Sequence, residues 1–134
     1  MNVSDTLYAA ALEAFKNAYA PYSKFNVGAA VLSASGKVYA GCNVENVSYP
    51  CGTCAEQSAL SAMVSAGETA VAEILILAGG NELISPCGAC LQRIKELALP
   101  NIKIHLADLN GIQQTLTMGE LLPHAFTAKE LQND

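Results

Sequence analysis

The sequence predicts an α/β fold with three layers, in which helices cover both faces of a mixed sheet of about five strands. Short apolar stretches typical of strands alternate along the chain with segments that have the apolar spacing of helices. An alternation of this kind is typical of a sheet with helices on both sides. The 134 residues are enough to bury a hydrophobic core, and no repeat or linker divides them, so we expect a single domain over residues 1–134.

The first expected element is a helix that Ser4 or Asp5 caps and that ends before Pro21. Its apolar positions, which form one stripe, are Leu7, Ala11, Ala14, Phe15 and Ala18. Small apolar residues then predict a strand at 26–33, and the turn that follows predicts a returning strand at 37–43.

A loop at residues 44–53 separates this hairpin from a helix at 54–66, which Gly67 should end in the C′ position. The apolar run 72–78 is the best candidate for the central strand of the sheet. Pro86 suits a first helical turn and predicts a helix at 86–97.

The last third of the chain should begin with a strand that Pro100 separates from the preceding helix. We expect two strands and then two short helices here, at residues 102–107, 114–117, 119–122 and 127–131. Helices between consecutive strands can place their N-termini at one end of the sheet, where ligand sites of α/β proteins usually lie.

The composition limits the class of protein and the kinds of partner that we expect. Half of the residues are apolar and 14% are charged, which favours a globular protein over a disordered one. The net charge is −5 and Arg93 is the single arginine, so we expect a small-molecule substrate and no nucleic acid as a partner. No apolar run is long enough to span a bilayer and no signal-peptide pattern is present, so we expect no membrane partner and a cytoplasmic protein.

Three thiols and one carboxylate lie where two predicted helices begin. Cys87 and Cys90 are one turn apart on one helix face, within reach of a single ion, and Cys54 can add a third sulfur from the other helix. Helix N-termini favour thiolates. Three protein ligands leave one tetrahedral position for water, as in a catalytic zinc site, and Glu56 can then lie beside that water.

A structural zinc held by four cysteines is the main alternative, because Cys51 and Cys54 form a second Cys-x-x-Cys pair. Such a protein would be a non-catalytic, zinc-stabilised binding module. The 32 residues between Cys54 and Cys87 exceed the spacing of about 15–20 that is usual in zinc ribbons. This favours the catalytic site, with Cys51 outside it.

The segments Cys54-Ala55-Glu56 and Pro86-Cys87-x-x-Cys90 together resemble the signature of zinc-dependent nucleoside deaminases. The resemblance runs from about Ala20 to Leu131, and it includes residues 20–30, 41–46 and 120–126. The sequence is similar to cytidine deaminases of the small, homotetrameric type, whose fold has a mixed sheet between layers of helices.

This resemblance implies a zinc ion on Cys54, Cys87 and Cys90, with Glu56 as the catalytic acid and base. Zinc lowers the pKa of a bound water to about 7. The resulting hydroxide would attack C4 of cytidine or deoxycytidine while Glu56 moves protons to N3 and to the departing amine. The products would be uridine or deoxyuridine and ammonia, in pyrimidine salvage.

The resemblance also implies the substrate contacts, which are Phe25, Asn43, Val44, Glu45 and Phe126. The amide and the carboxylate of this set would hold a ribose hydroxyl, Phe25 would lie against the pyrimidine, and Phe126 would come from a neighbouring subunit. By themselves, the polar pair is more typical of a turn, and the aromatic residues are more typical of a core or an interface.

Two positions depart from the family pattern, because Gln57 and Leu91 stand where relatives usually carry arginine. Zinc with three thiolates has a net charge of −1, so positive charge must come from the helix N-termini, from N–H groups or from Arg93.

A deaminase for larger cytosine antibiotics of the blasticidin S type is the second enzymatic function that the sequence suggests. The segments 24–25 and 43–45 favour the nucleoside, because they match its ring and ribose contacts.

Overall fold

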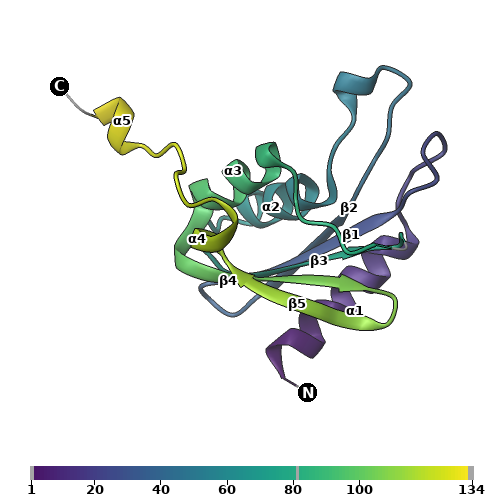
Figure 1. Cartoon of the computed structure of the whole chain (residues 1–134), viewed down its shortest axis with the longest axis horizontal. Helices are drawn as coiled ribbons and strands as arrows, with labels where there is room; N and C mark the ends of the chain where they lie inside the picture. The colour runs from purple at the N-terminus through teal and green to yellow at the C-terminus, as the bar shows by residue number, and fades with distance from the viewer. Residues whose placement is uncertain (1, 81, 133–134) are drawn as a thin grey trace.

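A computed structural model describes residues 2–80 and 82–132 and contains a five-stranded sheet in the order β2-β1-β3-β4-β5 (Figure 1). The strands are β1 (Val27–Ser33), β2 (Val38–Cys42), β3 (Val71–Ala78), β4 (Ala98–Asp108) and β5 (Gly111–Thr117). β3 and β4 pair in parallel, whereas the other three pairs are antiparallel. The predicted mixed sheet is confirmed, with β3 at its centre.

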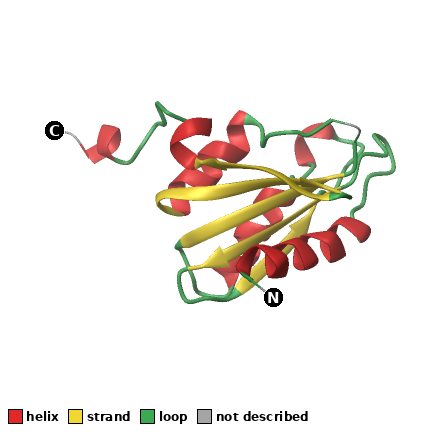
Figure 2. Ribbon diagram, turned by 60° about the horizontal axis from the view of Figure 1, so that its bottom comes forward, coloured by secondary structure: helices red, strands yellow, loops and turns green. Residues whose placement is uncertain are grey.

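Helices cover both faces of this sheet (Figure 2). The helices are α1 (Val3–Lys16), α2 (Ala55–Ser65), α3 (Gly88–Leu97), α4 (Met118–Leu121) and α5 (Lys129–Gln132), and η1 (Tyr49–Cys51) is a 3₁₀ turn. α1 packs alone on β1, β2 and β3, while α2 and α3 lie side by side on the opposite face. The three predicted layers are therefore present. In the described part of the chain, none of these helices is long and apolar enough to cross a membrane.

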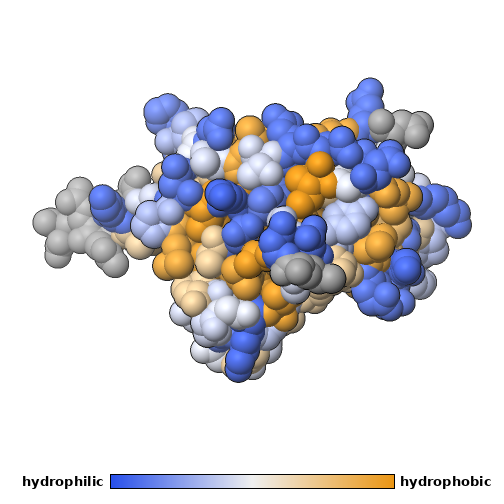
Figure 3. Space-filling view, turned by 90° about the horizontal axis from the view of Figure 1, so that it is seen from below, coloured by the Kyte–Doolittle hydropathy of each residue, from blue (hydrophilic) through white to orange (hydrophobic). Residues whose placement is uncertain are grey.

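Each face of the sheet has its own hydrophobic core. Leu7 and Ala11 of α1 pack against Leu75 and Leu77 of β3 on one side. The larger cluster lies under α2 and α3 and includes Met63, Ile74, Ile94 and Ile104, each completely buried. Because β3 contributes to both clusters, its run of apolar residues is that of a strand buried on two faces. The surface seen from below mixes polar and apolar residues (Figure 3).

The start of α1 differs from the prediction. Asn2, rather than Ser4 or Asp5, is the N-cap, because its side chain accepts a hydrogen bond from the backbone N–H of Asp5 at 2.9 Å. Asp5 instead occupies the third helical position and accepts a hydrogen bond from the Asn2 backbone, which completes a capping box. α1 ends at Lys16, well before Pro21, and the chain beyond it pairs at Tyr19 with the segment after β2.

Two boundaries near prolines also differ from the prediction. α3 begins at Gly88 with Cys87 as its N-cap, so Pro86 lies before the helix and not in its first turn. Pro100 lies within β4, which begins at Ala98. The pairing advances by five residues in β4 but by two in β3 over this stretch, from Val71↔Ala98 to Glu73↔Lys103. The irregular ladder accommodates a residue that has no N–H to donate.

Two glycines let helices approach the sheet closely. A Cβ atom at Gly28 of β1 would lie 2.1 Å from the backbone oxygen of Ala11 in α1. One at Gly41 of β2 would lie 2.4 Å from the backbone nitrogen of Ala59 in α2. Both layers therefore depend on positions without a side chain.

Replacing Gly28 by alanine is expected to lower the free energy of unfolding by about 1–3 kcal/mol or more, because backbone atoms of α1 would have to move. Chemical denaturation measures this change. Gly88→Ala is the matched control, since a Cβ atom there would meet nothing within 4 Å beyond its chain neighbours and the backbone of its own helix, and the stability of this variant should not fall. Equal stability of Gly28→Ala and the wild type would contradict the close packing of α1 on β1.

Candidate active site

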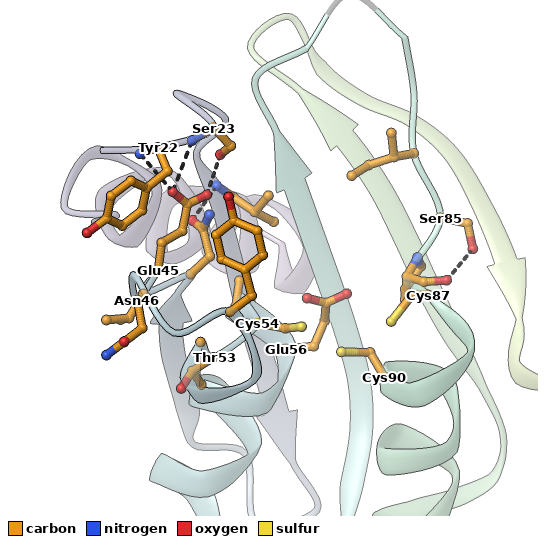
Figure 4. A pocket seen from close by; sticks show the side chains of 18 residues that line it. Tyr22, Ser23, Glu45, Asn46, Thr53, Cys54, Glu56, Ser85, Cys87 and Cys90 are labelled. Atoms are coloured by element: carbon orange, nitrogen blue, oxygen red, sulfur yellow. Dashed lines mark hydrogen bonds between the residues drawn. The ribbon is translucent and has the colours of Figure 1, made fainter. Parts of the chain in front are cut away.

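A cavity of about 600 Å³ opens where α2 and α3 begin (Figure 4). Seven of the nine residues predicted for the site line it: Asn43, Val44, Glu45, Cys54, Glu56, Cys87 and Cys90. These residues are far apart in the chain, and the topology of the sheet brings them together.

The direction of three strands explains this convergence. β2 and β3 are both antiparallel to β1, and β4 is parallel to β3, so β2, β3 and β4 run the same way. α2 follows β2 and α3 follows β3, so both helices begin at the same end of the sheet. Cys54 is the N-cap of α2 and Cys87 that of α3.

The three thiols lie close enough to influence one another. Backbone N–H groups at the start of α3, above all that of Cys90, lower the pKa of the Cys87 thiol. Burial raises the pKa of Cys90, and the nearby Glu56 and Cys54 raise it further. The pKa values of these neighbouring thiols are thus shifted in opposite directions, because each depends on the groups around it.

Glu56 lies in the first turn of α2 and is only 6% exposed. Burial raises the pKa of its carboxyl group, although its own backbone N–H and the Arg93 guanidinium act in the opposite direction. A carboxyl group with a raised pKa, placed beside thiols in a cavity, is suited to accept and return a proton near neutral pH.

The cavity contains the donor groups that a zinc site requires. Within the two described ranges, no three His, Cys, Asp or Glu side chains already form a closed metal cage. The chemistry nevertheless fits zinc: Cys54, Cys87 and Cys90 are free thiols that line one cavity from two helix N-termini. A divalent ion would replace the thiol protons and draw the three sulfurs together.

Positive charge beside the sulfurs comes from Arg93. Its Nη1 atom donates a hydrogen bond to Cys90 Sγ at 3.6 Å. Leu91 is 7% exposed and belongs to the core under α3, whereas Gln57 lines a separate groove between α2 and α3. Arg93, one of the predicted sources of positive charge, thus contacts a thiol directly.

The side chains of Asn43 and Glu45 already hold the cavity wall together. Asn43 Oδ1 accepts a hydrogen bond from the Val27 backbone, and Nδ2 donates one to the Phe25 carbonyl oxygen, both at 2.9 Å. Glu45 accepts hydrogen bonds from the backbones of Tyr22 and Ser23, each at 3.1 Å.

Phe25 and Phe126 do not line the cavity in the described chain. The Phe25 ring lies against Gly80, where a glycine leaves room for it. Phe126 is 55% exposed in the C-terminal segment. Cys51 is exposed in η1, does not line the cavity, and contacts Ser48 Oγ through its sulfur at 3.6 Å.

Other cavity residues were not predicted from the sequence. Tyr22 and Ser23 precede Phe25 in a segment that carries the resemblance, so their position could have suggested them. Ile84 and Ser85 have no comparable signal beyond their place just before Pro86.

Comparisons with known proteins agree with this geometry. Residues 1–106 match the model of the family described as the cytidine and deoxycytidylate deaminase zinc-binding region. The chain is 43% identical to a cytidine deaminase of Halalkalibacterium halodurans over 123 residues, which cover 92% of this chain and 93% of the relative. It is 39% identical to a cytidine deaminase of Sporosarcina psychrophila over 127 residues, which cover 95% and 93% of the two chains.

A solved structure shows the same fold. The crystal structure of a cytidine deaminase from Burkholderia pseudomallei superposes with a TM-score of 0.87 at 42% identity, over 94% of this chain and 100% of the other. The fold and the cavity therefore define a zinc-type nucleoside deaminase. This chain belongs to the cytidine and deoxycytidylate deaminase family.

Proposed function

We propose that this protein catalyses the hydrolytic, zinc-dependent deamination of cytidine and deoxycytidine, with uridine or deoxyuridine and ammonia as products, and that it acts in pyrimidine salvage. The observation that carries the proposal is the meeting of Glu56 with the thiols of Cys54, Cys87 and Cys90 in one cavity. Family membership supports the same activity, because relatives of similar length are cytidine deaminases.

In this proposal Cys54, Cys87 and Cys90 hold the metal and Glu56 moves protons. A zinc ion held there would lower the pKa of its bound water to about 7 and so supply a nucleophile at neutral pH. Glu56 would take one proton from that water and pass it to N3 of the pyrimidine, and would then take the second proton from the hydroxyl added at C4 and give it to the departing amine, which leaves as ammonia. Its burial supports this role, since a raised pKa favours the return of a proton.

Asn43, Val44 and Glu45 form the proposed sugar site. An ionised carboxylate has about four acceptor positions. Three acceptor positions of Glu45 already accept hydrogen bonds from Tyr22 and Ser23, two at Oε1 and one at Oε2. One acceptor is left for one sugar hydroxyl, which supports the acceptance of both the ribose and the deoxyribose nucleoside.

We also place the active form in a homotetramer in the cytoplasm, with sites shared between subunits. Tyr49, at 81% exposure, and Phe126, at 55%, are aromatic side chains without cover in the single chain. The C-terminal segment extends away from the body of the molecule (Figure 1), although Gln92 holds the Phe126 carbonyl oxygen at 2.8 Å. In this proposal a neighbouring copy covers these side chains and brings Phe126, together with Phe25, against the base.

The proposed location in the cytoplasm is supported by the free cysteines, because unpaired thiols favour a reducing compartment.

The test is to mix the purified protein separately with cytidine, deoxycytidine and blasticidin S and to follow the loss of absorbance that deamination causes. We expect turnover of the two nucleosides and slower or no turnover of the antibiotic. Light scattering on the same sample measures the mass of the assembly. Turnover of blasticidin S alone would contradict the proposed substrate, and a zinc-containing protein that turns over none of the three would be a binding module.

A further inference from the structure

The turn at residues 22–24 surrounds the carboxylate of Glu45 with hydrogen-bond donors. The backbone N–H groups of Tyr22 and Ser23 both donate to Oε1 at 3.1 Å, and the Ser23 hydroxyl donates to Oε2 (Figure 4). Lys24 has a φ of 61°, a left-handed conformation that non-glycine residues seldom adopt. Its N–H donates to the Ala20 carbonyl oxygen at 3.0 Å, which closes the turn.

The Ser23 hydroxyl also connects this turn to Phe25, which lies just before β1. While it donates to Glu45, its oxygen accepts a hydrogen bond from the Phe25 N–H at 3.0 Å. A single side-chain atom therefore fixes two neighbouring parts of the cavity wall. The Glu45 backbone is held independently, because its N–H donates to the Tyr19 carbonyl oxygen at 2.8 Å. Ser23 thus acts on the orientation of the carboxylate and not on the path of the backbone at Glu45.

We propose that Ser23 is a positioning residue that fixes the Glu45 carboxylate for a single hydroxyl of the nucleoside sugar. This inference rests on the proposed function: Ser23 would help to set the affinity of the active site for the sugar of the nucleoside. With Oε1 saturated and one acceptor used on Oε2, a ligand hydroxyl can reach Glu45 only at the remaining acceptor of Oε2. Without the Ser23 hydroxyl, the two backbone N–H groups would still hold Oε1, but Oε2 would lose the hydrogen bond that fixes its direction.

The charge of Glu45 supports the same role. The Ser23 hydroxyl, followed by its backbone N–H, lowers the pKa of the Glu45 carboxyl group, and the Tyr22 N–H and the charge of Lys24 act in the same direction. An ionised carboxylate accepts a stronger hydrogen bond from a sugar hydroxyl than a neutral acid does.

The experiment compares two substrates that differ only in the sugar. Steady-state kinetics are measured for the wild type, Ser23→Ala and Ser23→Thr with cytidine and with 2′,3′-dideoxycytidine, which lacks the hydroxyls that Glu45 could bind. We expect Ser23→Ala to raise KM for cytidine by about tenfold or more, the usual range for a lost hydrogen bond to a charged group, with kcat little changed. For dideoxycytidine the same variant should change KM by less than about threefold, because the lost interaction is already absent.

Ser23→Thr is the conservative control, because it keeps the hydroxyl, and it should retain most of the affinity for cytidine. Equal losses with both nucleosides would show a general structural role and overturn the inference, as would an unchanged KM for cytidine in Ser23→Ala. A Thr variant as impaired as the Ala variant would also overturn it. If the wild-type protein itself fails to deaminate cytidine, the proposed function fails first, and that result is distinguishable from a failure of Ser23 alone.

Discussion

Replacing Glu56 by glutamine is expected to lower kcat by about 10²–10⁴-fold, which is the usual contribution of a positioned acid and base. Glutamine has nearly the same shape and can still form hydrogen bonds, but it cannot accept a proton from water or return one to the amine. Because the side chain is buried and has a raised pKa, the loss of its proton transfer cannot be replaced easily by solvent. Steady-state kinetics with cytidine measure the effect.

The zinc content and the thermal stability of Glu56→Gln should remain those of the wild type, because Glu56 is not one of the proposed metal ligands. Glu13→Gln is the matched control: this glutamate is exposed on α1, across the sheet from the cavity, and its kcat should not change. A Glu56→Gln variant with normal turnover would remove Glu56 from the reaction, and loss of zinc in that variant would indicate that it is a ligand.

Cys54→Ala and Cys51→Ala are expected to behave in opposite ways, although the two cysteines are three residues apart. Cys54 lines the cavity at the N-cap of α2, whereas Cys51 is exposed in η1 and lies outside the cavity lining. Cys54→Ala should bind zinc poorly and lose about 10³-fold or more in turnover, because a catalytic metal supplies several kcal/mol and each 1.36 kcal/mol is worth tenfold in rate.

Zinc analysis after gel filtration, together with turnover of cytidine, measures this pair of variants. Cys51→Ala should keep one zinc ion per chain and the activity of the wild type. Loss of zinc from both variants would favour the alternative structural site with four cysteine ligands. Retention of zinc and activity in Cys54→Ala would show that Cys54 is not a ligand.

The order of elements and the relation of the two cysteine segments could be predicted from local patterns. The apolar run of β3 is continuous because both of its faces are buried, and it therefore marks the centre of the sheet. Gly67 ends the turn after α2 with a φ of 96°, as its position suggested. The meeting of Cys54 with Cys87 follows from helices that connect parallel strands.

Features that depend on distant contacts could not be predicted in this way. Pro100 indicates a break between helix and strand, but an irregular ladder with β3 keeps it in β4. Glu45 and Ser23 are 22 residues apart, and their contact exists only because the chain after α1 pairs with the segment after β2. The Phe25 ring lies against Gly80, in a position set by a loop that no local pattern describes.

The absence of a side chain at Gly41 links the spacing of the layers to the chemistry of the cavity. Ser58 and Ala59, which would meet a Cβ atom at this position, lie two and three residues after Glu56 on the same helix. A larger residue in β2 would lift α2 from the sheet and carry its first turn away from α3. The close packing at Gly41 therefore affects both the stability of the fold and the geometry of the cavity.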